Sequence, residues 1–145
     1  MATTVQITVD CSDPGRLAGF WALALGYVLD PPPPGFGSWP EALAARGIPE
    51  SEWNSASAVS DPDGAGPRLF FQRVPEPKTA KNRLHLDLRA GGPLDRPAGE
   101  RRAAVRAEAE RLAAAGATIV EARDGQWGEH WIVMLDPEGN EFCVT

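Results

Sequence analysis

The tetrad Asp61-Pro62-Asp63-Gly64 recurs, with one acidic residue exchanged, as Asp136-Pro137-Glu138-Gly139. Both tetrads have the composition of a tight turn, because Asp caps its own turn, Pro fixes the next φ, and Gly tolerates positive φ. Short apolar segments typical of strands flank each tetrad. The same turn in both halves of a 145-residue chain indicates an internal duplication.

The residues before the first tetrad predict one helix and several strands. Val5, Ile7 and Val9 alternate with polar side chains, which is the period of a strand buried on one face. Pro14 follows a capping aspartate and begins a helical pattern that stops at Gly26. The predicted elements are a strand over 5–11, a helix over 14–25, a strand over 27–29, a short helix over 41–46, and strands over 53–59 and 68–74.

The second half repeats this order. Leu84, Leu86 and Leu88 alternate with His85 and Asp87, and we expect the leucines of this strand to face a helix layer. A helix rich in Ala, Arg and Glu follows and stops at a glycine, as the first helix does. The predicted elements are a strand over 84–89, a helix over 100–115, and strands over 118–120, 127–135 and 141–145.

The pattern predicts an α+β fold of two tandem βαβββ modules, 1–78 and 79–145, in one domain over 1–145. We expect the strands to form a curved mixed sheet around a central cavity, with the helices outside. The fourth strand is ambiguous, because Leu69, Phe70 and Phe71 are apolar in succession and either face could be the inner one. The polar side chains expected to face the cavity are Gln6, Thr8, Asp10, His85, Asp87, Glu141 and Cys143.

Composition narrows the possible partners. The chain has 20 acidic and 14 basic residues, a net charge of −6, without a block of like charges, so nucleic acid and membranes are disfavoured. The apolar runs fall short of the roughly 18 residues that a membrane helix needs. The two cysteines, Cys11 and Cys143, are far apart, and we expect a cytoplasmic protein without a disulfide. A small molecule is the expected partner.

Three stretches resemble the vicinal oxygen chelate superfamily, which includes glyoxalase I, extradiol dioxygenases and bleomycin-resistance proteins. Within it the chain is most similar to an actinobacterial glyoxalase-like subgroup. The resemblance implies the glyoxalase/bleomycin-resistance/dioxygenase fold over nearly the whole chain, and it suggests a homodimer. The stretches are Val9-Asp10-Cys11-Ser12-Asp13 leading to Phe20-Trp21 and Leu25-Gly26-Tyr27, Arg83-Leu84-His85-Leu86-Asp87-Leu88, and Asp136-Pro137-Glu138-Gly139-Asn140-Glu141-Phe142.

The resemblance also implies positions for a divalent metal. Gln6, His85 and Cys143 fall where the superfamily's metalloenzymes carry ligands, and Glu141 lies two residues before the last of these positions. This set mixes a weak carboxamide, an imidazole and a soft thiolate. We therefore expect no tightly bound cofactor, while Zn, Fe, Mn or Ni stays an alternative. Cys143 has a plainer interpretation as a small buried residue.

Aromatic residues suggest a binding site for a flat or apolar molecule. Trp39, Trp53 and Trp127 lie near loops or strand ends, where aromatic side chains bind planar ligands or simply cover a sheet edge. The candidate ligand-binding residues are Gln6, Thr8, Trp39, Trp53, Phe71 and Trp127.

Three functions remain open from the sequence. The first is a protein that binds a small aromatic or apolar molecule without metal. The second is a metal-dependent lyase, isomerase or dioxygenase of the glyoxalase I type, with Asp87 or Glu141 moving a proton. The third is a metal-free enzyme with His85 as general base. The plainer alternative is a structural, hydrogen-bonded His85, with Asp87 in a salt bridge to Arg89 or Arg83.

Overall fold

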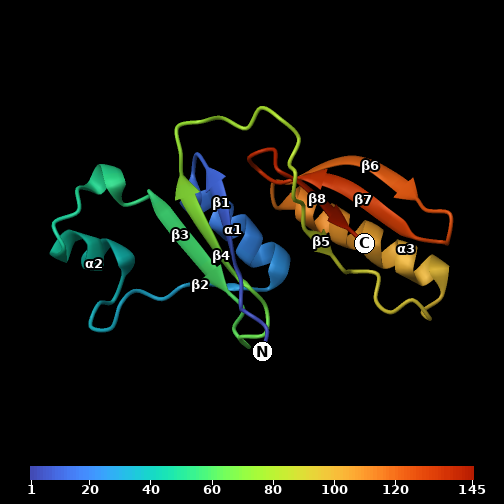
Figure 1. Ribbon diagram of the computed structural model, residues 1–145, viewed down its shortest axis with the longest axis horizontal. Helices are drawn as coiled ribbons and strands as arrows, with labels where there is room; N and C mark the ends of the chain where they lie inside the picture. The colour runs from blue at the N-terminus through green and yellow to red at the C-terminus, as the bar shows by residue number, and fades with distance from the viewer. The chain divides into compact units, whose positions relative to one another are not determined.

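Each half of the chain builds one four-stranded mixed sheet with a helix packed against it, in the computed structural model that describes residues 1–145 (Figure 1). The chain divides into two compact units, Met1–Pro77 and Lys78–Thr145, which we call unit 1 and unit 2. The α+β class and the two modules predicted from the sequence are confirmed.

Unit 1 has the strand order β1-β4-β3-β2. The β1 strand pairs in parallel with β4, and the other two pairings are antiparallel. Between β2 and β3 the chain makes a long excursion that carries a short helix and a 3-10 turn. The elements are β1 (Gln6–Cys11), α1 (Pro14–Leu25), β2 (Val28–Leu29), α2 (Trp39–Ala45), η1 (Glu50–Glu52), β3 (Ala56–Ser60) and β4 (Arg68–Arg73).

Unit 2 has the equivalent order β5-β8-β7-β6, again with its first strand parallel to its last. Its β6–β7 connection is a short turn where unit 1 has the excursion. The matching pairing of first and last strands supports the duplication that the turn tetrads predict. The elements are β5 (Asp87–Leu88), α3 (Ala98–Ala114), β6 (Thr118–Asp124), β7 (His130–Leu135) and β8 (Glu141–Val144).

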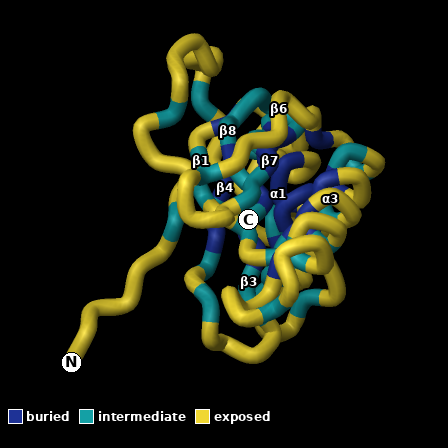
Figure 2. Tube along the Cα trace, turned by 90° about the vertical axis from the view of Figure 1, so that its right-hand side faces the viewer, coloured by how far each residue is buried: buried dark blue, intermediate teal, exposed yellow.

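The α1 helix forms as the sequence predicts and packs on β3 and β4. The Asp13 carboxylate caps it by accepting a hydrogen bond from the Arg16 backbone N–H, and Gly26 ends it at φ 70°. Its buried side chains include Leu17 and Trp21, and Figure 2 shows buried segments along this helix while the N-terminal residues are exposed. The sequence therefore places the core of unit 1 between α1 and its sheet.

In unit 2 the helix α3 packs on β6, β7 and β8. Val105, Ala109 and Leu112 form its buried stripe, as the sequence predicts, and Met134 and Phe142 are buried on the strands. The core of each unit therefore lies between one helix and one sheet face.

The two tetrads form equivalent turns. Gly64 N–H donates to Asp61 O at 3.0 Å, and Gly139 N–H donates to Asp136 O at 2.9 Å, with φ of 71° and 84° at the two glycines. Backbone N–H groups donate to both aspartate carboxylates. These hydrogen bonds, with that from Asp63 N–H contributing most, hold the pKa of Asp61 below its usual value.

Several predicted strand boundaries need correction. The strand expected over 84–89 is ordered as β5 only at Asp87 and Leu88, and Leu84 is 71% exposed instead of facing a helix. The ladder with β8 covers only Asp87 and Leu88, and Leu86 adds one backbone hydrogen bond by accepting from Cys143 N–H at 3.0 Å.

The strand expected over 53–59 begins only at residue 56, because residues 53–55 form a turn that follows η1. The strand expected over 118–120 continues to Asp124 with a bulge after Ile119, and the strand expected over 127–135 begins at His130. The positive φ of 84° at Gly128 belongs to the turn between them.

None of the helices combines the length and apolarity needed to cross a membrane.

Candidate functional site

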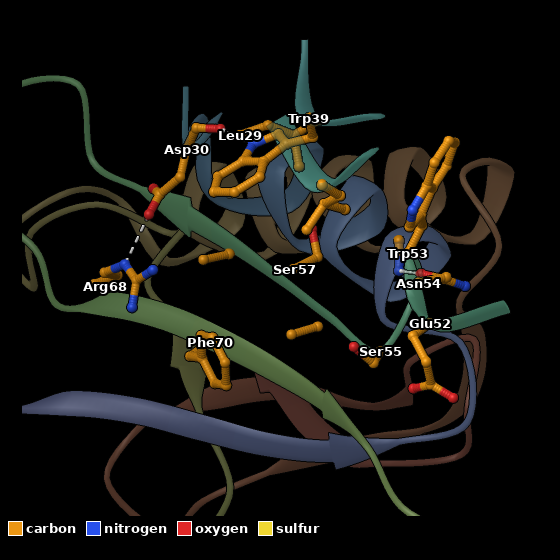
Figure 3. A pocket seen from close by; sticks show the side chains of 14 residues that line it. Leu29, Asp30, Trp39, Glu52, Trp53, Asn54, Ser55, Ser57, Arg68 and Phe70 are labelled. Atoms are coloured by element: carbon orange, nitrogen blue, oxygen red, sulfur yellow. Dashed lines mark hydrogen bonds and ion pairs between the residues drawn. The ribbon is translucent and has the colours of Figure 1, made fainter. Parts of the chain in front are cut away.

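A pocket of about 300 Å³ lies entirely within unit 1 (Figure 3). The excursion between β2 and β3 supplies its walls, and residues of β3 and β4 supply its floor. Its volume is at the low end of that of small-molecule sites, which suits a compound of one or two rings. The lining includes Leu29, Asp30, Trp39, Leu43, Glu52, Trp53, Asn54, Arg68 and Phe70.

Two tryptophans of the pocket are fixed through their indole N–H groups. Trp39 Nε1 donates to Asp30 O, and Trp53 Nε1 donates to Ile48 O, each at 2.9 Å. Because each indole donor already has a backbone partner, what these side chains can offer a ligand is their ring surface. Flat aromatic compounds pack favourably against such surfaces.

Arg68 and Asp30 form a polar end of the pocket. Arg68 Nε donates to Asp30 Oδ2 at 2.8 Å, and the Ser60 hydroxyl donates to the other Asp30 oxygen at 2.6 Å. Arg68 Nη1 donates to Gln6 Oε1 at 2.7 Å, and the guanidinium carbon lies 5.4 Å from the centre of the Phe70 ring. These contacts hold the guanidinium in one orientation over the pocket floor.

Asn54 connects the pocket wall to the start of α1. Its side-chain oxygen accepts from Gly15 N–H, and its amide nitrogen donates to Asp13 Oδ1, both at 2.8 Å. The hydrogen bond from Asn54 is the first cause of the lowered pKa of Asp13. A side chain at Gly15 would place its Cβ 3.0 Å from the Asn54 side-chain oxygen, so the Asn54 side chain would have to shift slightly.

The residues predicted to bind a ligand fall into different places. Trp39 and Trp53 line the pocket. Phe71 does not, because it is fully buried on the face of β4 that α1 covers, and Phe70 takes the position in the pocket instead. The structure thereby decides the strand face that three consecutive apolar residues left ambiguous.

The remaining three predicted ligand-binding residues lie outside the lining. Gln6 does not line the pocket but accepts a hydrogen bond from Arg68, which does. Thr8 is the register partner of Phe70 on the neighbouring strand. Trp127 is 88% exposed in the β6–β7 turn of unit 2.

Sequence reasoning missed Arg68, Asp30 and Asn54. Arg68 lies two residues before Phe70 on β4, so a correct face assignment would have found it. The roles of Asp30 and Asn54 depend on tertiary contacts that no local pattern indicates.

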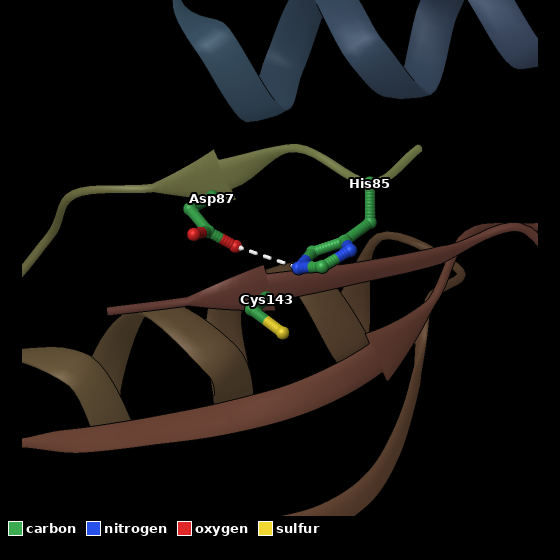
Figure 4. Close-up of side chains that lie close together, drawn as sticks. All are labelled: His85, Asp87 and Cys143. Carbon is green, nitrogen blue, oxygen red and sulfur yellow. Dashed lines mark ion pairs between the residues drawn. The ribbon is translucent and has the colours of Figure 1, made fainter. Parts of the chain in front are cut away.

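Unit 2 brings together a second group of candidate residues, His85, Asp87 and Cys143 (Figure 4). One possible ligand atom from each lies within 4.8 Å of the other two, and Asp87 is directly opposite Cys143 in the β5–β8 register. His85 Nε2 lies 3.4 Å from Asp87 Oδ1, and both side chains are largely exposed. An imidazole nitrogen, a carboxylate oxygen and a sulfur are a donor set that zinc accepts and manganese does not prefer.

The Cys143 thiol is not activated. Burial, followed by the negative charge of Asp87, raises its pKa above the ordinary value. A bound cation would oppose the effect of the carboxylate and favour the thiolate. The group therefore suits a metal ligand better than a free nucleophile.

Glu141, a candidate proton carrier, is engaged elsewhere in unit 2. Its carboxylate accepts from Asn82 N–H at 3.0 Å and pairs with Lys78 Nζ at 3.2 Å. The Asn82 hydrogen bond contributes most to lowering its pKa to about 2. Such a carboxylate is a poor proton acceptor near neutral pH, and its contacts instead hold the segment that leads into β5.

Comparison with known proteins gives the family. A model of the glyoxalase-like domain matches residues 6–145, and the chain belongs to this family. A comparison with curated proteins found no significant match.

Solved structures with the same fold cover nearly the whole chain. One is a glyoxalase/bleomycin resistance/dioxygenase family enzyme from Burkholderia phytofirmans PsJN, with 15% identity, a TM-score of 0.65, and coverage of 99% of this chain and 97% of that one. Another is a variant of the fosfomycin resistance protein FosX from Listeria monocytogenes, complexed with Mn(II) and 1S,2S-dihydroxypropylphosphonic acid, with 14% identity, a TM-score of 0.61 and coverage of 99% and 89%. Lactoylglutathione lyase from Agrobacterium tumefaciens has 12% identity, a TM-score of 0.57 and coverage of 99% and 92%.

At these identities the similarity shows the fold, and the function must be argued from the residues of this chain.

Proposed function

We propose that this glyoxalase-like protein binds a small aromatic or apolar organic molecule in the pocket of unit 1, without a tightly bound catalytic metal. The observation that carries the proposal is a pocket of about 300 Å³ with Trp39, Trp53 and Phe70 in its lining. The indole N–H groups of both tryptophans already donate to backbone carbonyls, so these side chains contact a ligand through their rings and favour a flat or apolar molecule.

The donor set at the superfamily's metal positions supports metal-independent binding. The Gln6 side-chain oxygen, the only atom of that amide suited to a metal, already accepts a charge-assisted hydrogen bond from Arg68 at 2.7 Å. Glu141 is held by Lys78 and Asn82. A metal bound to Gln6, or to Glu141 two residues before the last of these positions, would have to displace these contacts.

Binding of a plain aromatic probe tests the proposal. Equilibrium dialysis of 2-methylnaphthalene against the protein, with EDTA present, is expected to show saturable binding that Trp53→Ala weakens at least tenfold. The matched control is Trp127→Ala, because this tryptophan is 88% exposed and outside the pocket lining. Equal effects of the two substitutions, or no saturable binding to the wild-type protein, would contradict the proposal.

A second candidate function is a metal-dependent enzyme. It rests on the proximity of His85, Asp87 and Cys143, which offer one nitrogen, one oxygen and one sulfur within 4.8 Å. These residues would hold zinc, and the metal would supply Lewis acidity to a substrate oxygen. Near one equivalent of zinc after incubation and desalting, lost in His85→Ala but kept in Cys11→Ser, would favour this function.

A metal-free enzyme with His85 as general base is a third candidate, since Asp87 lies 3.4 Å from its Nε2 and could orient the imidazole. Activity that survives EDTA and disappears in His85→Ala would support it.

We also propose that the protein is a cytoplasmic homodimer. Light scattering of the purified protein tests the oligomeric state. Membership of an actinobacterial subgroup is a further proposal from the sequence motifs.

A further inference from the structure

The Arg68 guanidinium is only partly used by the protein. Its Nε is bound to Asp30 and its Nη1 to Gln6, whereas Nη2 has no hydrogen-bond partner in the chain. The side chain is 40% exposed and belongs to the pocket lining. The two N–H donors of Nη2 are therefore left without a partner in the chain, on a side chain that lines the pocket.

This arginine is fixed before any ligand arrives. Asp30 and Gln6 hold it by two hydrogen bonds, Ser60 holds Asp30, and the guanidinium lies 5.4 Å from the Phe70 ring centre. A long side chain normally loses conformational freedom when it binds a ligand. Because the freedom of Arg68 is already restricted, a hydrogen bond from Nη2 to a ligand would cost little additional conformational entropy.

From this geometry we propose that Arg68 binds a carboxylate oxygen of the ligand, so that the ligand of this pocket is an aromatic carboxylate of one or two rings. The inference rests on the proposed function, because it uses the same aromatic pocket. A carboxylate is a stronger acceptor for guanidinium N–H groups than a neutral oxygen. The pocket volume of about 300 Å³, at the low end for small-molecule sites, favours a ligand of this small size.

The charged residues at the two ends of the pocket also determine which way round the ligand binds. Figure 3 shows Arg68 and Asp30 at one end of the pocket and Glu52 near Trp53 at the other. Each Asp30 oxygen already accepts one hydrogen bond, from Arg68 or from Ser60, and the Arg68 cation offsets the Asp30 charge. Glu52 would repel a carboxylate at its end, although Arg73 at 3.1 Å weakens that repulsion. The carboxylate therefore belongs beside Arg68, with the rings extending toward Trp53.

Three matched probes separate this inference from the proposed function. They are 2-naphthoate, its neutral amide 2-naphthamide, and 2-methylnaphthalene, which has no oxygen. Equilibrium dialysis at pH 7.5 is expected to rank the affinities in that order, with 2-naphthoate at least tenfold tighter than 2-methylnaphthalene, as one charge-assisted hydrogen bond allows. Binding of none of the three would refute the proposed function itself. Equal binding of all three would keep the proposed function and overturn the carboxylate inference.

Variants locate the effect at Arg68. Arg68→Met is expected to weaken 2-naphthoate at least tenfold and to weaken 2-methylnaphthalene, which has no acceptor for Nη2, by a clearly smaller factor. Arg106→Met, which removes the same charge from an exposed position on α3, is the control and should change neither. Arg68→Lys guards against misfolding: it keeps a cation beside Asp30, and circular dichroism should match the wild type while 2-naphthoate weakens. Unchanged 2-naphthoate affinity in Arg68→Lys and Arg68→Met would refute the inference.

Discussion

The two units share one βαβββ topology and differ in what fills the connection between their second and third strands. In unit 1 this connection is long, carries α2 and η1, and lines a pocket with two tryptophans. In unit 2 this connection is the short turn between β6 and β7. The candidate residues of unit 2 lie elsewhere, on and before β5 and on β8: the exposed pair His85 and Asp87, with Cys143. The repeated framework therefore gives each unit its own helix-on-sheet core, while the longer connection in unit 1 creates the candidate binding site.

The largest expected effect distinguishes the two faces of β4. Phe71→Ala should destabilise the protein by about 3–5 kcal/mol, because it empties a fully buried position beneath α1. Phe70→Ala should cost much less stability and should weaken binding of 2-methylnaphthalene instead. Chemical denaturation with dialysis checks both variants. The reverse pattern would mean that the pocket face of β4 is assigned incorrectly.

Acid should destabilise unit 2 through Glu141. The pKa of this carboxyl is about 2 in the folded protein and 4.5 ordinarily, so its stabilising contribution is complete above about pH 4.5 and is lost as the pH falls toward 2. Glu141→Gln should be less stable than the wild type at pH 7, by at most about 3 kcal/mol, and the difference should shrink at acid pH. Urea unfolding at several pH values measures this. A difference independent of pH would contradict the role given to Lys78 and Asn82.

A smaller effect on stability is expected at Asn54, whose hydrogen bonds form the joint between the pocket wall and the start of α1. Asn54→Ala removes the hydrogen bonds to Gly15 and Asp13 and should cost about 1–2 kcal/mol. Ligand affinity should fall as well, because Asn54 lines the pocket beside Trp53. Thermal unfolding and dialysis report the two effects. Lost stability with unchanged affinity would separate this joint from the binding site.

The smallest effect is expected at the exposed group of unit 2. His85→Ala and Asp87→Ala should each change the free energy of unfolding by less than about 0.5 kcal/mol, because exposed ion pairs contribute little. Neither should alter affinity for 2-naphthoate, which can be measured by dialysis in EDTA. A tenfold loss of affinity in either variant would remove the functional contrast between the units.

The framework was predictable from the sequence because its signals are local. Pro14 and Gly26 mark the ends of α1, and the tetrads at Asp61 and Asp136 mark equivalent turns. The glyoxalase-like family followed from motifs spread along the chain and is confirmed.

The candidate site was less predictable, for physical reasons. The positions of Trp39 and Trp53 near loops predict their place in the pocket, but the sequence favours Phe71 where Phe70 lines the pocket, because alternation is lost in a run of apolar residues. Arg68 was missed for the same reason. The strand expected around His85 is shorter than its alternating pattern suggests, because alternation does not show where the ladder with the neighbouring strand begins, and here it covers only Asp87 and Leu88.

The most direct test of the account is a nitrogen–proton NMR titration of the indole N–H signals with 2-naphthoate in EDTA. Single Trp→Phe substitutions assign the five tryptophan signals. The account predicts saturable shifts at Trp39 and Trp53 with an unchanged signal from Trp127. Shifts confined to Trp127, or shifts that require added zinc, would contradict a metal-independent aromatic site in unit 1.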